Sequence, residues 1–226
     1  MIQIKVSGLK KVYQHQHIKT EALRGLALEI HHQEFISIVG PSGSGKTTLL
    51  YVLSGLESFD EGDVSIFNKP LKSYTEKEKA SLRSNDIGFV FQFYNLIPNL
   101  TVFENVMLAA VIGKQKTKDE VLDLLDLVDM KKYESYYPKQ LSGGMQQRVA
   151  IARCLVNDPK IIFADEPTGN LDYENGMKII ELFRKLNQDY HKTILMVTHN
   201  LDTTVYSTRI LHMLDGKVIH DEKKSK

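Results

Sequence analysis

The chain has 226 residues, of which 42% are hydrophobic and 25% are charged, and its formal net charge at pH 7 is +1. This length allows one substantial hydrophobic core and favours a single domain over two independent ones. A net charge so close to zero creates no field that would recruit nucleic acid, so we expect no nucleic-acid partner.

The sequence contains no apolar run that approaches the roughly 18 residues needed for a membrane-spanning helix. The N-terminus alternates apolar and polar residues like a strand, and it lacks the apolar core of a secretory signal. The single cysteine, Cys154, cannot form an internal disulfide, and we interpret it as a small apolar residue. These features predict a cytoplasmic protein.

The first half of the chain is predicted to run from strands through a Gly/Ser-rich turn into a helix. Residues 26–30 and 35–39 have the pattern of strands, and residues 46–54 have the pattern of a helix. Further short apolar runs at 87–91, 161–164 and 194–197 alternate with helical patterns. This order predicts an α/β fold with a largely parallel sheet.

A helical region is predicted to interrupt this sheet domain. Residues 101–128 have a helical pattern, in which Thr117 and Glu120 form a capping box. The division that we predict is a core of about 1–92 and 157–220 and a helical subdomain of about 93–156.

The end of the chain is predicted to close the sheet with a hairpin. Asp215-Gly216 favours a type I′ turn between strands at 210–214 and 217–219. Residues 221–226 are charged and have no apolar anchors, so they are predicted to form a flexible tail.

Residues 40–47 fit the phosphate-loop pattern G-x-x-x-x-G-K-[ST] and lie between a predicted strand and a predicted helix. In such a loop, backbone N–H groups converge on phosphate oxygens, the lysine reaches the β- and γ-phosphates, and the following hydroxyl can bind Mg²⁺. The predicted nucleotide contacts here are Gly40, Pro41, Ser42, Gly43, Ser44, Gly45, Lys46, Thr47 and Thr48. This motif alone leaves kinases, GTPases and ATPases open.

Two carboxylates, Asp165 and Glu166, follow the apolar run at 161–164. An aspartate at the end of a buried strand can lie beside Mg²⁺, and the next carboxylate can accept a proton from an attacking water. A solvated strand end is the alternative interpretation of this pair alone.

Residues 141–148 read Leu-Ser-Gly-Gly-Met-Gln-Gln-Arg and precede a helical stretch. Ser142, Gly143 and Gly144 present a hydroxyl and accessible backbone N–H groups at the start of that helix, which is a second place for an anion. A helix cap without a further role is the alternative.

These three motifs, in this order, resemble those of ABC ATPases, and the resemblance covers residues 2–219. It implies an α/β fold: a P-loop ATPase core with a mixed, largely parallel sheet and flanking helices, an inserted helical subdomain and an N-terminal antiparallel β region. It also implies that two copies pack head to tail and hold two ATP molecules between them, with Mg²⁺. Interfaces of this kind have two-fold symmetry.

The resemblance further implies roles for single residues. Glu166, His199, Gln92 and Lys46 are implied to be catalytic, and Thr47, Gln92 and Asp165 to bind the metal. Tyr13 matches the aromatic residue that stacks on adenine, and Asp172 lies in the loop that crosses the dimer interface. Two positions depart from the family pattern, namely Met145 and the pair Gly169-Asn170.

Residues 165–172 and 88–93, and the spacer after Tyr13, resemble a subgroup of lipoprotein-releasing, macrolide- or peptide-exporting and cell-division ATPases, and the longer spacer favours the first two. The implied function is to power a separate integral-membrane permease from the inner face of the cell membrane, for export or extraction of a lipoprotein, peptide or antimicrobial. A periplasmic or extracellular adaptor is a further candidate partner. A regulatory ATPase that signals to a membrane protein without moving cargo is the alternative.

Other functions fit the sequence less well. Chromosome-type ABC ATPases need a long coiled coil and translation-factor types need two cassettes, and neither fits this length. A small-molecule kinase leaves residues 141–148 unexplained. The pairs His15/His17 and His31/His32 have no third ligand nearby and are predicted to be solvated, and residues 68–70 are predicted to form a turn.

Residues 92–100 are predicted to dock the membrane partner, because they join Gln92 to aromatic and aliphatic residues that look exposed. The alternative is that these side chains belong to the core of the helical region.

Overall fold

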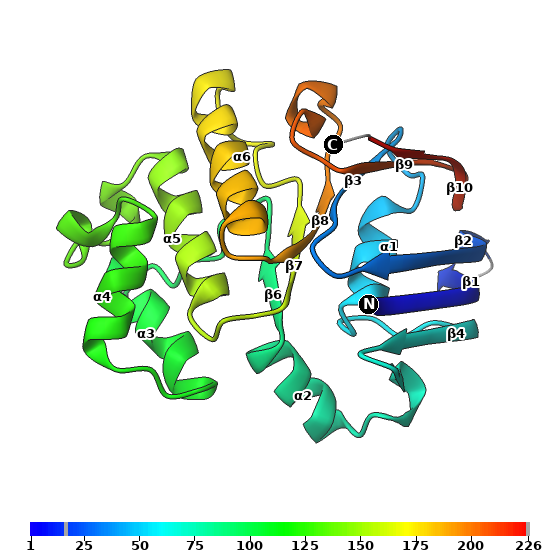
Figure 1. The fold of residues 1–226 in the computed structure, drawn as a ribbon, viewed down its shortest axis with the longest axis horizontal. Coiled ribbons are helices and arrows are strands. Elements are labelled where there is room, and N and C mark those ends of the chain that lie inside the picture. Colours follow the sequence, from blue (N-terminus) through cyan, green and yellow to red (C-terminus); the bar gives the residue numbers. More distant parts are fainter. Residues whose placement is uncertain (16–17, 225–226) are drawn as a thin grey trace.

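Two β-sheets form the framework of the chain, which a computed structural model describes over residues 1–15 and 18–224 (Figure 1). The first sheet is antiparallel, with the strand order β2-β1-β4-β5. Its strands are β1 (Ile2–His15), β2 (Ile18–His31), β4 (Glu61–Ile66) and β5 (Lys69–Pro70). The predicted N-terminal antiparallel region is therefore confirmed.

The second sheet has the order β10-β9-β3-β8-β7-β6, and its neighbouring strands are parallel except in the β9–β10 hairpin. Its strands are β3 (Phe35–Val39), β6 (Ile87–Val90), β7 (Ile161–Asp165), β8 (Thr193–Val197), β9 (Arg209–Leu214) and β10 (Lys217–Lys223). The predicted strands at 35–39, 87–91, 161–164 and 194–197 lie in this sheet, whereas the one at 26–30 lies in β2 of the antiparallel sheet.

Six α-helices cover the sheets in the described part of the chain. They are α1 (Lys46–Leu53), α2 (Glu76–Asn85), α3 (Val102–Ile112), α4 (Lys118–Leu127), α5 (Gly143–Leu155) and α6 (Tyr173–Gln188). Single 3₁₀ turns occupy Leu71–Ser73, Lys131–Tyr133, Pro138–Gln140 and Leu201–Thr204. Within residues 1–15 and 18–224, no helix has the length and apolar character required to cross a bilayer.

The helical pattern predicted over residues 101–128 corresponds to two helices. Gly113 ends α3, and Thr117 begins α4 with its side chain accepting a hydrogen bond from the backbone N–H of Glu120. The predicted capping box is therefore present, and it marks a new helix. Helices α3 to α5 fall within residues 93–156.

The parallel strands are buried on both faces, because successive side chains of a strand point to opposite sides of a sheet. Ile161 and Phe163 pack in one apolar cluster with α1 and the antiparallel sheet. Ile162 and Ala164 pack in a second cluster with α3, α4, α5 and α6. Figure 1 shows these two sets of elements on opposite sides of the parallel sheet.

The C-terminal hairpin confirms one prediction and corrects another. Asp215 and Gly216 both have positive φ, 46° and 75°, as a type I′ turn requires. Strand β10 continues to Lys223, and the buried Arg209 donates two hydrogen bonds of 2.7 Å to the carboxylate of Asp221. The prediction of a flexible tail is therefore wrong for residues 221–223, since a buried guanidinium requires a partner there.

Several smaller predictions can also be compared with the structure. Cys154 packs its sulfur against the backbone of Gly88, and burial raises the pKa of its thiol to about 12, as expected of a packing residue. The turn predicted at residues 68–70 is only partly correct: Phe67 and Asn68 have positive φ and connect β4 to β5, but Lys69 and Pro70 form β5 itself. His31 ends β2, and His32 Nδ1 lies 3.1 Å from the Gln3 side chain. The prediction for His15 and His17 concerns side chains outside the described residues.

Candidate active site

The phosphate loop, defined here as residues 40–48, connects β3 to the start of α1. Gly45 has a φ of 94°, and a β-carbon at this position would overlap the carbonyl oxygen of Ala22. Only glycine fits this close approach. The next residue is Lys46, whose Nζ donates hydrogen bonds to the carbonyls of Gly40 at 2.9 Å and Pro41 at 2.8 Å. The ammonium group is thereby held at the mouth of the loop.

Burial lowers the pKa of Lys46, while the nearby carboxylates of Glu166 and Asp165 act in the opposite direction. A partly dehydrated ammonium group interacts more strongly with an anion than a fully hydrated one does. The position of Lys46 therefore favours binding of a phosphate.

Ser44 has a buried hydroxyl without a hydrogen-bond partner among the described residues. This hydroxyl faces Gly40 across the loop, and a β-carbon built on Gly40 would lie 2.9 Å from Ser44 Oγ. An unpaired buried polar group is costly unless a bound molecule satisfies it. The loop therefore has the features of a site for a polar ligand.

Thr47 and Asp165 meet where α1 begins and β7 ends. Thr47 Oγ1 donates a 3.0 Å hydrogen bond to Asp165 Oδ1. Burial raises the pKa of Asp165, and the hydrogen bond from Thr47 lowers it. A hydroxyl and a carboxylate are hard oxygen ligands, and proteins commonly bind Mg²⁺ through one or two carboxylates together with substrate phosphates. This donor set fits Mg²⁺.

Glu166 adopts a left-handed backbone conformation with a φ of 46° directly after β7. Its N–H donates to the carbonyl of Val197 at 3.0 Å, and its Oε2 lies 3.2 Å from His199 Nδ1. Strained backbone of this kind persists where the surrounding structure requires it, and it is frequent at active sites. The two side chains face the phosphate loop from the ends of β7 and β8.

Lys46, Thr47, Glu166 and His199 line one pocket of about 350 Å³, whereas Gly40, Pro41, Ser44 and Asp165 are not part of its lining. Its walls come from β2, the phosphate loop, and the residues after β7 and β8, and they consist of Thr20, Glu21, Ala22, Ser42, Gly43, Gly45, Lys46, Thr47, Thr48, Glu166 and His199. The predicted residues of the phosphate loop, the second carboxylate and the histidine are therefore together. The pocket combines an ammonium group, backbone donors, a carboxylate and an imidazole, which suits phosphate chemistry.

Gln92 lies beside the loop of residues 169–172. A β-carbon built on Gly169 would lie 2.9 Å from Gln92 Nε2, and Asn170 Nδ2 donates to the Gln92 carbonyl at 3.1 Å. Within the described residues, neither Thr47 nor Asp165 forms a hydrogen bond with Gln92. Gly169 and Asn170, which depart from the family pattern, therefore both contact Gln92: Gly169 packs against its side chain, and Asn170 donates a hydrogen bond to its carbonyl.

Ser142 is the N-cap of α5, and its hydroxyl accepts a 3.3 Å hydrogen bond from the N–H of Met145. Gly143 and Gly144 form the first turn, and Met145 packs on the apolar cluster of the helices. None of these residues lines the pocket at the phosphate loop within the described chain. Asp172 similarly caps α6, where it accepts from the N–H of Asn175 at 2.9 Å.

Side chains of α5 hold the segment that follows β6. Gln147 Nε2 donates to the Phe91 carbonyl at 3.4 Å, and Arg153 donates to the carbonyls of Tyr94, at 2.9 Å, and Asn95. The helix that begins at the Ser-Gly-Gly sequence is therefore tied directly to the segment containing Gln92.

Tyr13 lies near the end of β1 and is partly exposed. Its hydroxyl donates a 2.6 Å hydrogen bond to Glu57 and lies 3.4 Å from Thr48 Oγ1, which lines the pocket. The predicted aromatic residue is therefore adjacent to the phosphate loop.

Two residues near the site were missed by sequence reasoning. One is Tyr51: burial, and then the charge of the nearby carboxylate of Asp165, raise the pKa of Tyr51. Helical spacing could have identified it, because residue 51 lies one turn after Thr47. Glu57 has no such signal, because its partners belong to a strand far away in the sequence.

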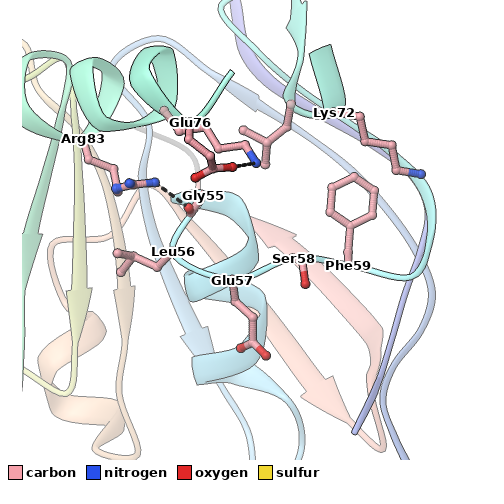
Figure 2. A pocket seen from close by; sticks show the side chains of 10 residues that line it. Gly55, Leu56, Glu57, Ser58, Phe59, Lys72, Glu76 and Arg83 are labelled. Atoms are coloured by element: carbon pink, nitrogen blue, oxygen red, sulfur yellow. Dashed lines mark hydrogen bonds and ion pairs between the residues drawn. The ribbon is translucent and has the colours of Figure 1, made fainter. Parts of the chain in front are cut away.

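A second pocket of about 370 Å³ lies between the end of α1 and α2 (Figure 2). Its lining combines Lys72, Glu76 and Arg83 with apolar side chains, and Arg83 Nη1 donates to the Gly55 carbonyl at 2.9 Å. This second pocket shares no lining residue with the pocket at the phosphate loop.

The profile of the family described as ABC transporter matches residues 23–169. An uncharacterized ABC transporter ATP-binding protein of Thermotoga maritima is 45% identical over 95% of this chain and 92% of its own length. The lipoprotein-releasing system ATP-binding protein LolD of Cytophaga hutchinsonii is 44% identical, with 88% and 92% of the two chains covered. The macrolide export ATP-binding/permease protein MacB of Chlorobium phaeobacteroides is 42% identical over 98% of this chain but only 34% of its own.

A solved structure of an ATP-binding cassette is also similar to this chain. The dimeric post-hydrolysis state of the ATP-binding cassette MJ0796, bound to ADP and Pi, has a TM-score of 0.91 with 39% identity and 99% of each chain covered. MJ0796 is from Methanocaldococcus jannaschii.

Proposed function

Because this chain belongs to the ABC transporter family and is an ATPase of that family, we propose that it is the subunit whose ATP hydrolysis powers a separate membrane permease. The observation that carries this proposal is the single pocket that joins Lys46 and Thr47 to Glu166 and His199. Those groups suit the binding and cleavage of a nucleoside triphosphate.

In this proposal, residues 40–48 surround the phosphates of ATP and Lys46 contacts the β- and γ-phosphates. Tyr13 stacks on the adenine. Mg²⁺, when bound, would neutralise phosphate charge, and Thr47, Asp165 and Gln92 would hold it. The 3.0 Å contact between Thr47 and Asp165 supports the first two of these ligands.

Glu166 is proposed to act as the general base. It accepts a proton from a water whose oxygen attacks the γ-phosphorus, while the bond from that phosphorus to the bridging oxygen breaks and ADP leaves. His199 would orient the carboxylate and contact the γ-phosphate, and its 3.2 Å distance from Glu166 supports the first of these roles.

The second anion site requires a second copy of the chain. Ser142, Gly143 and Gly144 do not line the pocket at the phosphate loop, so we assign them to the ATP held by a partner copy. Asp172 would lie in the same interface. The dimeric structure of MJ0796, with its high similarity to this chain, supports this arrangement.

The membrane partner is proposed to dock at residues 92–100 and the adjoining face of α3. Phe93 is 69% exposed and Ile97 is 40% exposed, while Leu96 packs against the helical cluster. The alternative of a core role therefore fits Leu96, and the docking role fits Phe93. On α3, the apolar residues Leu108, Val111 and Ile112 are also exposed. This docking would hold the chain at the inner face of the cell membrane.

The names of two relatives support a proposal about the class of cargo. LolD and MacB carry the words lipoprotein-releasing and macrolide export in their names, so we propose export or extraction of a lipoprotein, peptide or antimicrobial. A periplasmic or extracellular adaptor would act with the permease.

The test is purification of the intact complex from native membranes with the wild-type chain and with Phe93→Glu. The wild type should retain one integral-membrane polypeptide that stimulates its ATP hydrolysis, and Phe93→Glu should lose both. Ile219→Glu is the matched control, because Ile219 is an exposed apolar residue on β10. Equal retention by Phe93→Glu would contradict the docking site. A stimulating partner that moves no cargo in vesicles would favour the regulatory alternative.

A further inference from the structure

The loop after α1 contacts β1 at the residues around Tyr13. Glu57 Oε2 accepts the 2.6 Å hydrogen bond from Tyr13 Oη, and Glu57 Oε1 lies 3.2 Å from Lys11 Nζ. Asp60 Oδ2 accepts from the N–H of Val12 at 2.7 Å. The loop is therefore bonded to three consecutive residues of the strand.

The part of β1 that makes these contacts is irregular. The pairing of β1 with β2 shifts its register between Lys11 and Val12. A register shift of this kind redirects the side chains that follow it. Tyr13 is the next residue; its backbone pairs with Thr20 in the register that follows the shift, and its hydroxyl contacts Glu57 outside this ladder.

The contacts of Glu57 are shielded from solvent. The side chain of Lys11 is 10% exposed and that of Glu57 is 24% exposed. An ion pair in such surroundings is screened less than one on the open surface. Lys11 Nζ also lies 5.2 Å from the centre of the Tyr13 ring. Ring, carboxylate and ammonium group therefore form one cluster.

The carboxylate of Glu57 serves this cluster and not the neighbouring pocket. Glu57 belongs to the lining of the pocket between α1 and α2, but Figure 2 shows its carboxylate pointing away from Arg83 and Glu76. In the described part of the chain, that carboxylate contacts Tyr13 and Lys11.

We propose that Glu57 is a positioning residue for nucleotide binding, which holds the ring of Tyr13, with the help of Lys11, in the orientation in which adenine stacks on it. The proposal rests on the proposed function, because that function places adenine at Tyr13. A hydrogen bond through the phenolic oxygen fixes the ring from its edge. Lys11 lies over one face of the ring, so stacking on adenine would use the opposite face.

The experiment compares the affinities of two probes, ATP and inorganic tripolyphosphate, by titration calorimetry of the full chain. Tripolyphosphate has no base, so only ATP should report on Tyr13. We expect Glu57→Ala to weaken ATP binding about 3- to 10-fold and Tyr13→Ala to weaken it about 10-fold, with tripolyphosphate affinity changed less than about twofold. Glu57→Gln keeps an acceptor for the tyrosine hydroxyl and should recover part of the loss. It also serves as the second variant if Glu57→Ala does not fold.

A double-mutant cycle separates positioning from a general structural effect. In a Tyr13→Ala background, Glu57→Ala should cause no further loss of ATP affinity. Glu61→Gln is the matched control, because Glu61 also pairs with a lysine of β1, Lys10, at 2.6 Å and does not contact Tyr13.

Two outcomes would overturn the proposal. One is an equal loss of tripolyphosphate and ATP affinity in Glu57→Ala, and the other is full ATP affinity in Glu57→Ala while Tyr13→Ala is weakened. Normal ATP binding by Tyr13→Ala would contradict the stacking of adenine on Tyr13 that the proposed function includes. It would also contradict the role of Glu57, which depends on that stacking.

Discussion

The hydroxyl of Tyr94 lies 2.6 Å from the position that a β-carbon on Gly143 would occupy. Tyr94 follows Gln92 in the segment after β6, and Gly143 opens α5. The first glycine of the Ser-Gly-Gly sequence therefore has a packing reason in addition to the proposed contact with phosphate. The start of α5 and the segment containing Gln92 touch directly at this point.

We expect Gly143→Ala to lower the free energy of unfolding by about 1–3 kcal/mol, because the added methyl group overlaps the Tyr94 hydroxyl. Tyr94→Phe removes that hydroxyl and should recover most of the loss. Gly144→Ala is the control, since its β-carbon would meet Asn175 at an ordinary distance of 3.5 Å. Urea denaturation measures the free energy of unfolding of the wild type, Gly143→Ala, Gly143→Ala with Tyr94→Phe, and Gly144→Ala. An equal loss in Gly144→Ala, or no recovery with Tyr94→Phe, would contradict the packing account.

Glu166→Gln should reduce ATP hydrolysis by about 10²- to 10⁴-fold, because the amide keeps the volume of the side chain but cannot accept a proton. ATP binding should survive. Removing a negative charge near the γ-phosphate should also let an ATP-bound dimer accumulate. Hydrolysis assays and size-exclusion chromatography with and without ATP measure both effects, with the exposed Glu181→Gln as the control. Wild-type hydrolysis, or a monomer at saturating ATP, would argue against this mechanism.

Lys46→Ala should weaken ATP binding about 10- to 100-fold, the range expected for one or two charge-assisted hydrogen bonds. The substitution also removes the two hydrogen bonds that Lys46 makes to its own loop. Calorimetric titration with ATP is the measurement, and Lys77→Ala, an exposed lysine on α2, is the control. Near-normal affinity in Lys46→Ala would remove the basis for assigning the phosphate loop.

The ion pair of Arg209 and Asp221 should make the free energy of unfolding depend on pH in the acidic range. The hydrogen bonds and charge of Arg209 lower the pKa of Asp221 in the folded chain. A carboxyl group whose pKa is lowered by folding contributes stability above its unfolded pKa of about 3.9, and this contribution is lost as the pH falls through the folded value.

The stability difference between the wild type and Asp221→Asn should therefore be present at pH 7 and shrink below about pH 4. Urea denaturation across this range tests it. Asp123→Asn, at an exposed position on α4, should show little difference at any pH. A difference for Asp221→Asn that stays constant down to the lowest pH would show that the lost contact is not electrostatic.

Local chemistry explains which parts of the fold could be predicted. The turn at Asp215-Gly216 and the cap at Thr117 depend on residues close together in the sequence, and both predictions were confirmed. The prediction of a flexible tail was wrong because Asp221 is the partner of the buried Arg209. Arg209 becomes buried only when β9, β10 and the loop before β3 come together. Charge alone could not reveal this partner.

In the candidate site too, residues within local motifs could be predicted, whereas contacts between distant segments could not. Lys46, Thr47, Asp165 and Glu166 follow directly from motifs, since each motif contains both the functional residue and the strand or helix that positions it. Glu57 lies in no motif, and its role depends on the approach of a loop to β1. The close contact of Gln92 with Gly169 likewise depends on two loops meeting in space.

The turn of the C-terminal hairpin has a consequence for the order of folding during synthesis. The N–H of Gly216 donates to the carbonyl of Ser44 at 3.1 Å, and the Gly216 carbonyl accepts from the N–H of Arg24 at 2.9 Å. The loop proposed to hold phosphate is thus bonded to a residue that leaves the ribosome long after it. A nascent chain that ends before β9 lacks both bonds, so the loop acquires its final support only when β9 and β10 have joined the sheet.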